Sequence, residues 1–189
     1  MPVARSVPSP RPGGPSDSRA LVITTTFGWP LAGYPAVRRT LEVVGSRPFG
    51  AVNNLTNVMA RFTASRYGVG REMSRADRRA FLGPWRSRNS RRTTQQTLAG
   101  VLRIDPVMAE VERSLRIALA DLPVLTLFGR KNDRYGWQAR FGQIFPQATA
   151  TTIERGHHFP FDDDPDAYSG AICTWWARKV APQGNSACP

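Results

Sequence analysis

The chain has 189 residues, 41% of them hydrophobic, which suffices for one globular domain with a buried core but not for two well-built domains. Its 24 arginines and 2 lysines, Lys131 and Lys179, outnumber the 14 acidic residues and give a net charge of +12. No apolar run approaches the roughly 20 residues that a membrane span needs, and the N-terminus lacks the apolar core of a signal peptide. These features exclude a membrane-spanning protein.

The net charge bears on the partners of the protein, and the cysteines bear on its cellular compartment. An excess of arginine is typical of proteins that bind nucleic acid or anionic surfaces, and it is equally typical of the arginine-for-lysine usage of a GC-rich genome. The two cysteines, Cys173 and Cys188, form no disulfide framework. This indicates a reducing, cytoplasmic compartment.

The first part of the chain predicts a tail followed by a strand. Residues 1–19 are rich in Pro, Gly, Ser and Arg, so we expect them to be disordered. Ala20–Thr26 is apolar and β-branched along its whole length, a pattern typical of a strand buried on both faces of a parallel sheet. Gly28 and Pro30 then end the strand.

Residues 31–104 predict a group of short amphipathic helices without a convincing strand. Ser74 and Asp77 have the spacing of a capping box, which indicates a helix start. The segment Gly83–Arg92 predicts a basic loop. The expected helices are Pro35–Val44, Val52–Phe62 and Ala76–Leu82.

The chain from residue 105 onward predicts alternating helices and strands. Asp105 and Pro106 are a helix N-cap and first helical residue, and Asp164 and Pro165 repeat that signal later. The alternation predicts a parallel α/β sheet with right-handed crossovers. We expect a flexible tail over 182–189. The expected elements are a helix to Leu122, a strand Val124–Phe128, a helix from about Tyr135 to Phe145, a strand Ala148–Ile153 and a last helix from Pro165.

Two chemically active residues follow the last two predicted strands. Asp133 follows Val124–Phe128, and His158 follows Ala148–Ile153. Carboxyl ends of parallel strands meet at one edge of a sheet, so a carboxylate and an imidazole there are two members of a hydrolytic triad. A histidine, with a reference pKa of about 6.5, suits a general base near neutral pH. The alternative is that Asp133 caps the following helix and His158 only caps a strand end.

A metal site is a further alternative for the same region. His157, His158 and the acids Asp162–Asp164 lie close together in the sequence. Neighbouring residues of an extended segment point in opposite directions, and the acids have the position of an N-cap cluster for the last helix. We therefore expect no metal and no cofactor.

From about Ala20 to Trp176 the chain resembles the second part of an α/β-hydrolase of the haloalkane dehalogenase-like group. The segments LVITTTFGWP, PVLTLFGRKNDRYGW and ATTIERGHHFPFDDDP resemble the last three strands of that family, and AFLGPW resembles a recurring cap sequence. The resemblance implies a partial α/β-hydrolase fold of about three parallel strands with flanking helices and a helical cap insertion. It implies a core from residues 20–30 and 105–181 and a cap from 31–104.

The same resemblance assigns roles to residues. Asp133 corresponds to the triad acid, and His158, because Phe159 follows it, corresponds to the base. Candidates for an apolar substrate pocket are Trp29, Trp85 and Trp137, although each of these is also explained by core packing. The implied substrate is a small apolar organic molecule such as a haloalkane, an ester or an epoxide.

The nucleophile of such a hydrolase is missing from the sequence. No Gly-x-Ser-x-Gly or Gly-x-Asp-x-Gly frame occurs, and a remnant at Gly13–Pro15 would place Arg11 at the attacking position. Ala20–Thr26 would also form an apolar sheet edge. We therefore expect an N-terminally truncated hydrolase that is inactive by itself. The alternative is a fragment whose exposed strand edge pairs with a separate N-terminal half or with another copy of the chain.

Two other functions remain open. The chain is a non-catalytic binding partner or pseudoenzyme if the pocket and cap serve only to bind. A nucleic-acid binder is less favoured, because the basic run offers no aromatic ring that could stack on a base apart from Trp85. Its candidate residues are Arg75, Arg78, Arg79, Arg86, Arg88, Arg91 and Arg92.

Overall fold

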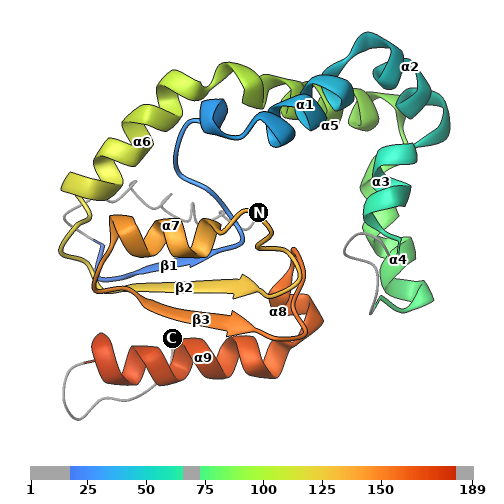
Figure 1. Ribbon diagram of the computed structural model, residues 1–189. Helices are drawn as coiled ribbons and strands as arrows, with labels where there is room; N and C mark the ends of the chain where they lie inside the picture. The colour runs from blue at the N-terminus through green and yellow to red at the C-terminus, as the bar shows by residue number, and fades with distance from the viewer. Residues whose placement is uncertain (1–17, 66–72, 182–189) are drawn as a thin grey trace, which may run out of the picture.

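The computed structural model describes residues 18–65 and 73–181 (Figure 1). Three strands, β1 (Leu21–Thr24), β2 (Val124–Gly129) and β3 (Thr149–Ile153), form one parallel sheet in the order β1-β2-β3. The predicted fold class, three parallel strands with flanking helices, is confirmed. The tail predicted over 182–189, the Gly13–Pro15 remnant and the tail predicted over 1–19, apart from Ser18 and Arg19, lie outside the described residues.

The central strand β2 carries the core on both of its faces. All its residues are buried, as expected for a strand that pairs with a neighbour on each side. Val124 and Phe128 point into a cluster on one face, and Leu125 and Leu127 into a second cluster on the other. Because these side chains alternate, each face of the sheet presents apolar residues against which a helix can pack.

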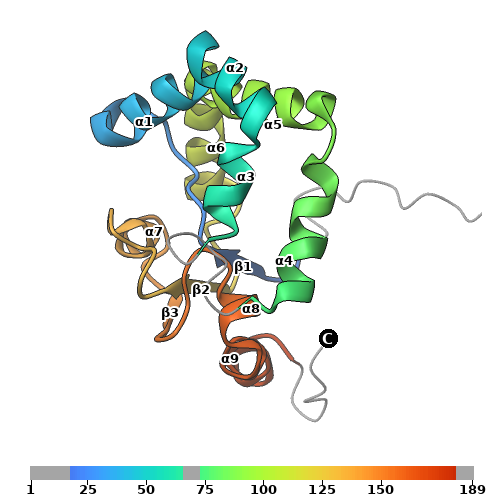
Figure 2. The same ribbon diagram turned by 90° about the vertical axis from the view of Figure 1, so that its right-hand side faces the viewer.

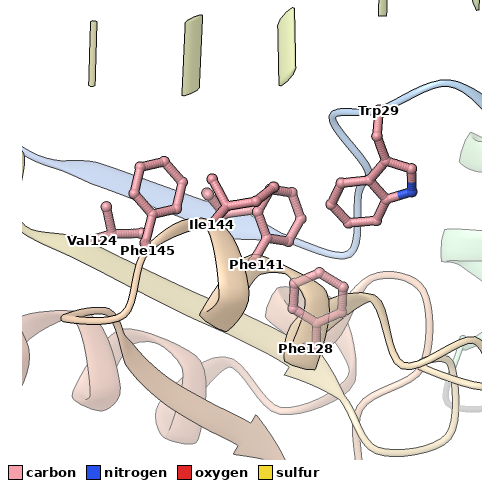
Figure 3. Packing of buried hydrophobic residues seen from close by; sticks show 7 residues of the cluster. Trp29, Val124, Phe128, Phe141, Ile144 and Phe145 are labelled. Carbon is pink, nitrogen blue, oxygen red and sulfur yellow. The ribbon is translucent and has the colours of Figure 1, made fainter. Parts of the chain in front are cut away.

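The helices outside the insertion are α6 (Asp105–Ile117), α7 (Trp137–Ile144), α8 (Pro160–Asp163) and α9 (Pro165–Lys179), of which α7 and α9 cover the two faces of the sheet. Helix α7 lies on one face, where Phe141 and Ile144 pack with Trp29, Val124 and Phe128 (Figure 3). Helix α9 lies on the opposite face, where Trp175 packs against Leu125, Leu127 and Ile153. Figure 1 shows these as three layers.

Strand β1 is the edge of this sheet. Only Ile23 of its four residues is buried, and Val22 is exposed. The prediction that this strand is covered on both faces is therefore wrong for the described residues. The expected open edge is present among the described strands, of which β1 pairs only with β2.

Residues 31–104, here called the helical insertion, connect β1 to α6 and extend away from the sheet (Figures 1 and 2). No strand occurs in the part of it that is described, as predicted. Its 3-10 turns are η2 (Leu31–Gly33), η3 (Gly83–Trp85) and η4 (Val101–Arg103). Its helices are α1 (Pro35–Gly45), α2 (Arg47–Thr56), α3 (Val58–Thr63), α4 (Arg75–Leu82) and α5 (Arg88–Gly100).

Some expectations for the insertion are confirmed and others are wrong. The capping box of α4 is present: the Ser74 hydroxyl accepts from the Asp77 amide at 3.1 Å, and the Asp77 carboxylate accepts from the Ser74 amide at 3.1 Å. The helix expected over Val52–Phe62 is instead α2 and α3, because Asn57 adopts a left-handed conformation with φ 55°. The basic loop expected over Gly83–Arg92 is instead η3 and the start of α5, which Ser87 caps.

Two further expectations need correction. Asp105 is not an N-cap: its carboxylate accepts from the Leu31 amide at 3.0 Å and pairs with Arg38 at 2.9 Å, which ties the start of the insertion to α6. Cys173 in α9 is disulfide-bonded, so the expected reduced state is wrong for this residue. No helix among residues 18–65 and 73–181 is long and apolar enough to cross a membrane.

Candidate functional site

The loops that follow β2 and β3 meet at the carboxyl edge of the sheet. The Arg130 amide donates to the Ile153 carbonyl at 3.0 Å, and the Lys131 amide donates to the Gly156 carbonyl at 3.2 Å. A side chain at Gly129 would overlap the backbone of Gly156 and His157, so glycine permits this close approach. The backbone thus brings the two loops with the predicted acid and base into contact.

A bidentate ion pair reinforces this junction from outside. The Arg130 guanidinium, just beyond β2, binds both carboxylate oxygens of Glu154, just beyond β3. The hydrogen bond from Arg130 is the main reason that the pKa of Glu154 lies below its ordinary value. Both side chains are largely exposed, so the pair orients the loops more than it stabilises the fold.

His158 contacts Asn132 rather than Asp133. The His158 Nδ1 lies 3.3 Å from the Asn132 Nδ2, and the His158 ring also packs on Phe159 with centroids 4.9 Å apart. Because an amide nitrogen can only donate, Nδ1 accepts this hydrogen bond, and the proton of the neutral ring is then on Nε2. Asn132 is therefore in a position to orient the imidazole.

The surroundings of His158 favour its neutral form. Its pKa is lowered by desolvation, although part of the ring stays exposed. No carboxylate contributes to this shift, in contrast to the acid-stabilised imidazolium of a complete triad. A neutral imidazole with one open side is suited to accept a proton near neutral pH.

Asp133 is engaged with helix α7. Its carboxylate accepts from the Trp137 amide at 2.6 Å and from the Gln138 amide at 3.2 Å. These amides belong to the first turn of a helix whose N-cap, Gly136, has no side chain to supply an acceptor. No hydrogen bond or ion pair joins Asp133 to His158 in the described part of the chain, so the helix-capping interpretation holds for Asp133 in this conformation.

The neighbouring His157 and Asp163 fix the loop backbone. The Asp163 carboxylate is buried and accepts from the His157 amide at 2.6 Å. Only Asp164 of the acidic cluster caps α9, by accepting from the Ala167 amide at 3.3 Å. The expectation that all these acids cap the last helix is therefore wrong for Asp163.

An apolar hollow of about 390 Å³ lies beside this loop. One wall is helix α4 of the insertion, and the other is α8 with the residue that follows His158. Figure 2 shows α4 above α8. The lining residues are Met73, Asp77, Ala80, Phe81, Phe159, Phe161 and Asp162.

The three predicted pocket tryptophans lie in two separate places. Trp29 is fully buried in the core, 6.3 Å from Trp137 between ring centroids, and the guanidinium of Arg140 lies 4.4 Å from the Trp29 ring. The indole N–H groups of Trp29 and Trp137 are buried without a protein acceptor. Trp85 instead lies in η3, where its N–H donates to Thr94 at 2.9 Å.

Neither a metal cluster nor a nucleophile completes the site within the ranges described. No group of three His, Cys, Asp or Glu residues there is arranged to hold a metal. No serine, cysteine or aspartate among these residues hydrogen-bonds to His158; Asn132 is its hydrogen-bonding partner. The sequence pattern did not reveal Asn132, because the family resemblance directed attention to the adjacent carboxylate.

Comparison with known proteins supports the fold. No protein-family model matches the sequence, and no curated protein does. The structure is similar to that of a loop variant of the haloalkane dehalogenase DbeA from Bradyrhizobium elkanii, with a TM-score of 0.63 and 18% sequence identity. The match covers 85% of this chain and 59% of that chain. The similarity shows a partial α/β-hydrolase-like fold.

Proposed function

We propose that this chain is the acid–base portion of an α/β-hydrolase of the haloalkane dehalogenase-like type, and that His158 is its general base. The observation that carries the proposal is the position of His158. It follows the last strand of the sheet, its pKa is lowered by desolvation, and the next residue lines an apolar hollow. A base beside an apolar pocket suits the hydrolysis of a small apolar substrate.

His158 would accept a proton at Nε2 from the attacking group while Nδ1–H is held from behind. In the present conformation the Asn132 amide nitrogen faces Nδ1 instead, so this step requires an acceptor in its place. Asp133 remains our candidate for the acid, because a carboxylate that accepts two amide bonds retains lone pairs for a third donor. A small shift of the 130–136 loop would then exchange Asn132 for Asp133 at the imidazole.

The proposed pocket combines the apolar hollow with two indole donors. The helical insertion would act as the cap, with Phe81 of α4 facing Phe159 and Phe161 across the hollow. The indole N–H groups of Trp29 and Trp137 are buried without a protein acceptor, and the two rings lie 6.3 Å apart between centroids. Donors of this kind stabilise negative charge that develops during hydrolysis.

The nucleophile would come from a segment that pairs with the open edge of β1. The similar dehalogenase is longer than the region that this chain matches, and β1 offers unpaired backbone groups on one side. We propose an N-terminal half, encoded with or apart from this chain, as the partner for that edge. A second copy of the chain is the competing occupant.

Ligand binding tests the pocket in the 189-residue chain itself. We expect 1-chlorohexane or ethyl butyrate to shift the imidazole NMR signals of His158. Phe161→Ala should weaken this binding, because Phe161 lines the hollow at 48% exposure. Phe62→Ala is the matched control, since Phe62 is 61% exposed and lies outside the hollow. Equal effects of the two variants would refute the pocket.

Turnover tests the base. The chain alone should show no His158-dependent hydrolysis of esters, chloroalkanes or epoxides. When a segment with a nucleophile elbow is supplied, the hydrolysis rate should fall about 10²–10⁴-fold in His158→Ala. Unchanged turnover in that variant would refute the role of His158.

A binding protein without turnover is the second candidate. The engagement of Asp133 with helix α7 favours it, because that carboxylate does not reach the imidazole. If the completed protein binds the apolar ligands at His158 but hydrolyses none of them, this candidate replaces the hydrolase.

A further inference from the structure

The positive charge of the protein is concentrated in the helical insertion. Residues 31–104 contain 14 arginines and three acids, Glu42, Glu72 and Asp77, a net charge of +11. The remaining residues contain 12 basic and 11 acidic side chains, a net charge of +1. Arginine-for-lysine usage acts on the whole chain and does not remove acids from one segment. The charge is therefore a local property of the insertion.

Within the insertion, arginines converge on one hollow of about 500 Å³. It lies between the end of α2, helix α3, helix α4 and the start of α5. Among the described residues, six arginines and no carboxylate line it. The lining residues are Leu55, Thr56, Asn57, Arg61, Arg75, Arg78, Arg79, Leu82, Trp85, Arg86 and Arg91.

The spacing of α4 explains why its arginines reach this hollow. Arg75, Arg78 and Arg79 are separated by three and four residues, so they lie on one helix face. Asp77 and Phe81 lie on the other face, toward the apolar hollow. Helix α4 therefore divides two sites of opposite character, and the arginine hollow lies on the other side of this helix from the apolar hollow.

Two side chains in the wall are held in fixed positions. The Arg91 guanidinium donates to the carbonyls of Arg86 at 2.9 Å, Ser87 at 3.2 Å and Leu55 at 3.4 Å, which links α5 to the end of α2. Trp85 is fixed through its N–H by Thr94 and through its ring by Phe81, with centroids 5.0 Å apart. An aromatic ring and an oriented guanidinium thus stand in one wall.

Five of the six arginines make no ion pair with a described side chain. These five are Arg61, Arg75, Arg79, Arg86 and Arg91. Guanidinium groups that face a common space repel one another, and a bound anion removes that repulsion. The planar fork of a guanidinium matches two oxygens of a phosphate group, which makes phosphate the anion that this wall fits best.

We propose that this hollow binds a phosphate-bearing ligand of nucleotide size, with the phosphates on the arginines and a ring against Trp85. The volume falls within the roughly 300–1,000 Å³ range of small-molecule sites. Five of the seven arginines that the sequence suggested for nucleic-acid contact line the hollow; Arg88 and Arg92 do not. The phosphates therefore belong either to a free nucleotide or to a nucleic-acid strand.

Isothermal titration calorimetry with ATP, inorganic tripolyphosphate and a 12-residue oligothymidylate tests the proposal. We expect ATP and tripolyphosphate to bind with one-to-one stoichiometry. The double variant Arg75→Ala/Arg79→Ala should weaken both at least about tenfold. The control Arg39→Ala/Arg88→Ala removes the same charge from exposed positions outside the hollow and should weaken them less than about threefold. Trp85→Ala should weaken ATP but not tripolyphosphate.

The outcomes separate the alternatives. Tighter binding of the oligothymidylate than of ATP, lost in the double variant but not in the control, would keep the site and identify nucleic acid as the source of the phosphates. Equal weakening in the double variant and the control would show attraction by the general charge and overturn the site. Absence of binding by all three probes at low salt would also overturn it.

Discussion

Replacement of Asp133 by alanine tests whether this carboxylate caps helix α7. The variant removes the acceptor for the amides of Trp137 and Gln138, at 2.6 and 3.2 Å. Loss of a helix cap costs about 0.5–2 kcal/mol, and hydrogen bonds to a charged group contribute about 1.5–3 kcal/mol. Since α7 also carries Phe141 into the core, we expect the free energy of unfolding to fall by about 2 kcal/mol.

Urea unfolding at pH 7.5 measures this change as a lower midpoint at an unchanged m-value. Asp133→Asn keeps one oxygen acceptor and should lose only about 1 kcal/mol. Asp121→Ala is the control, because Asp121 is exposed and its side chain makes no hydrogen bond to another described residue; it should stay within about 0.5 kcal/mol of the parent chain. A change in Asp133→Ala no larger than that of the control would refute the capping role.

Three further predictions follow from the core, the loop junction and the imidazole. Phe141→Ala should lower the free energy of unfolding by about 3–5 kcal/mol in urea titrations, because the ring is buried at 2% exposure. Gly129→Ala should prevent native packing, since its methyl group meets the backbone of His157, whereas Gly142→Ala in α7 meets nothing and should stabilise the fold by up to about 1 kcal/mol; thermal unfolding compares them. The pKa of His158, followed by NMR, should lie below its ordinary value. Protonation is then harder in the folded than in the unfolded state, so stability should fall as pH falls through that range, and His158→Ala should weaken this dependence.

The elements of the core could be predicted because their signals are local. The largely apolar run of β2 and the Asp164–Pro165 helix start are each signalled by neighbouring residues, and both are present in the structure. The same holds for the Ser74–Asp77 capping box. Signals of this kind can be recognised in the sequence without knowledge of tertiary contacts.

The errors arise where distant contacts decide the outcome. Asp105 has the sequence context of an N-cap, but the partners that its carboxylate binds, Leu31 and Arg38, are more than 60 residues away in the sequence. Asn57 breaks an apolar stripe of helical spacing by adopting a left-handed conformation, which leaves Leu55 exposed. Neither effect has a signature within a few residues of its position.

The candidate site was predictable at the level of loops but not of contacts. Strand order placed Asp133 and His158 on two loops that meet. The partners of each side chain depend on the loop geometry, which brings Asn132 to the imidazole and turns Asp133 toward α7. Adjacent residues of a short loop can point in different directions, and a sequence pattern does not show which of them faces the imidazole.

Helix α4 predicts a measurable link between the two proposed sites. Its arginine face lines one hollow and its Phe81 face lines the other, so a ligand that orders α4 in one hollow also fixes a wall of the second. We expect tripolyphosphate to raise the affinity of the chain for 1-chlorohexane, and by linkage 1-chlorohexane must raise the affinity for tripolyphosphate by the same factor. Calorimetric titrations of each ligand in the presence of the other measure both factors. Arg75→Ala/Arg79→Ala should abolish the effect while leaving 1-chlorohexane binding itself intact; independent affinities in the parent chain would show that α4 is already rigid without either ligand.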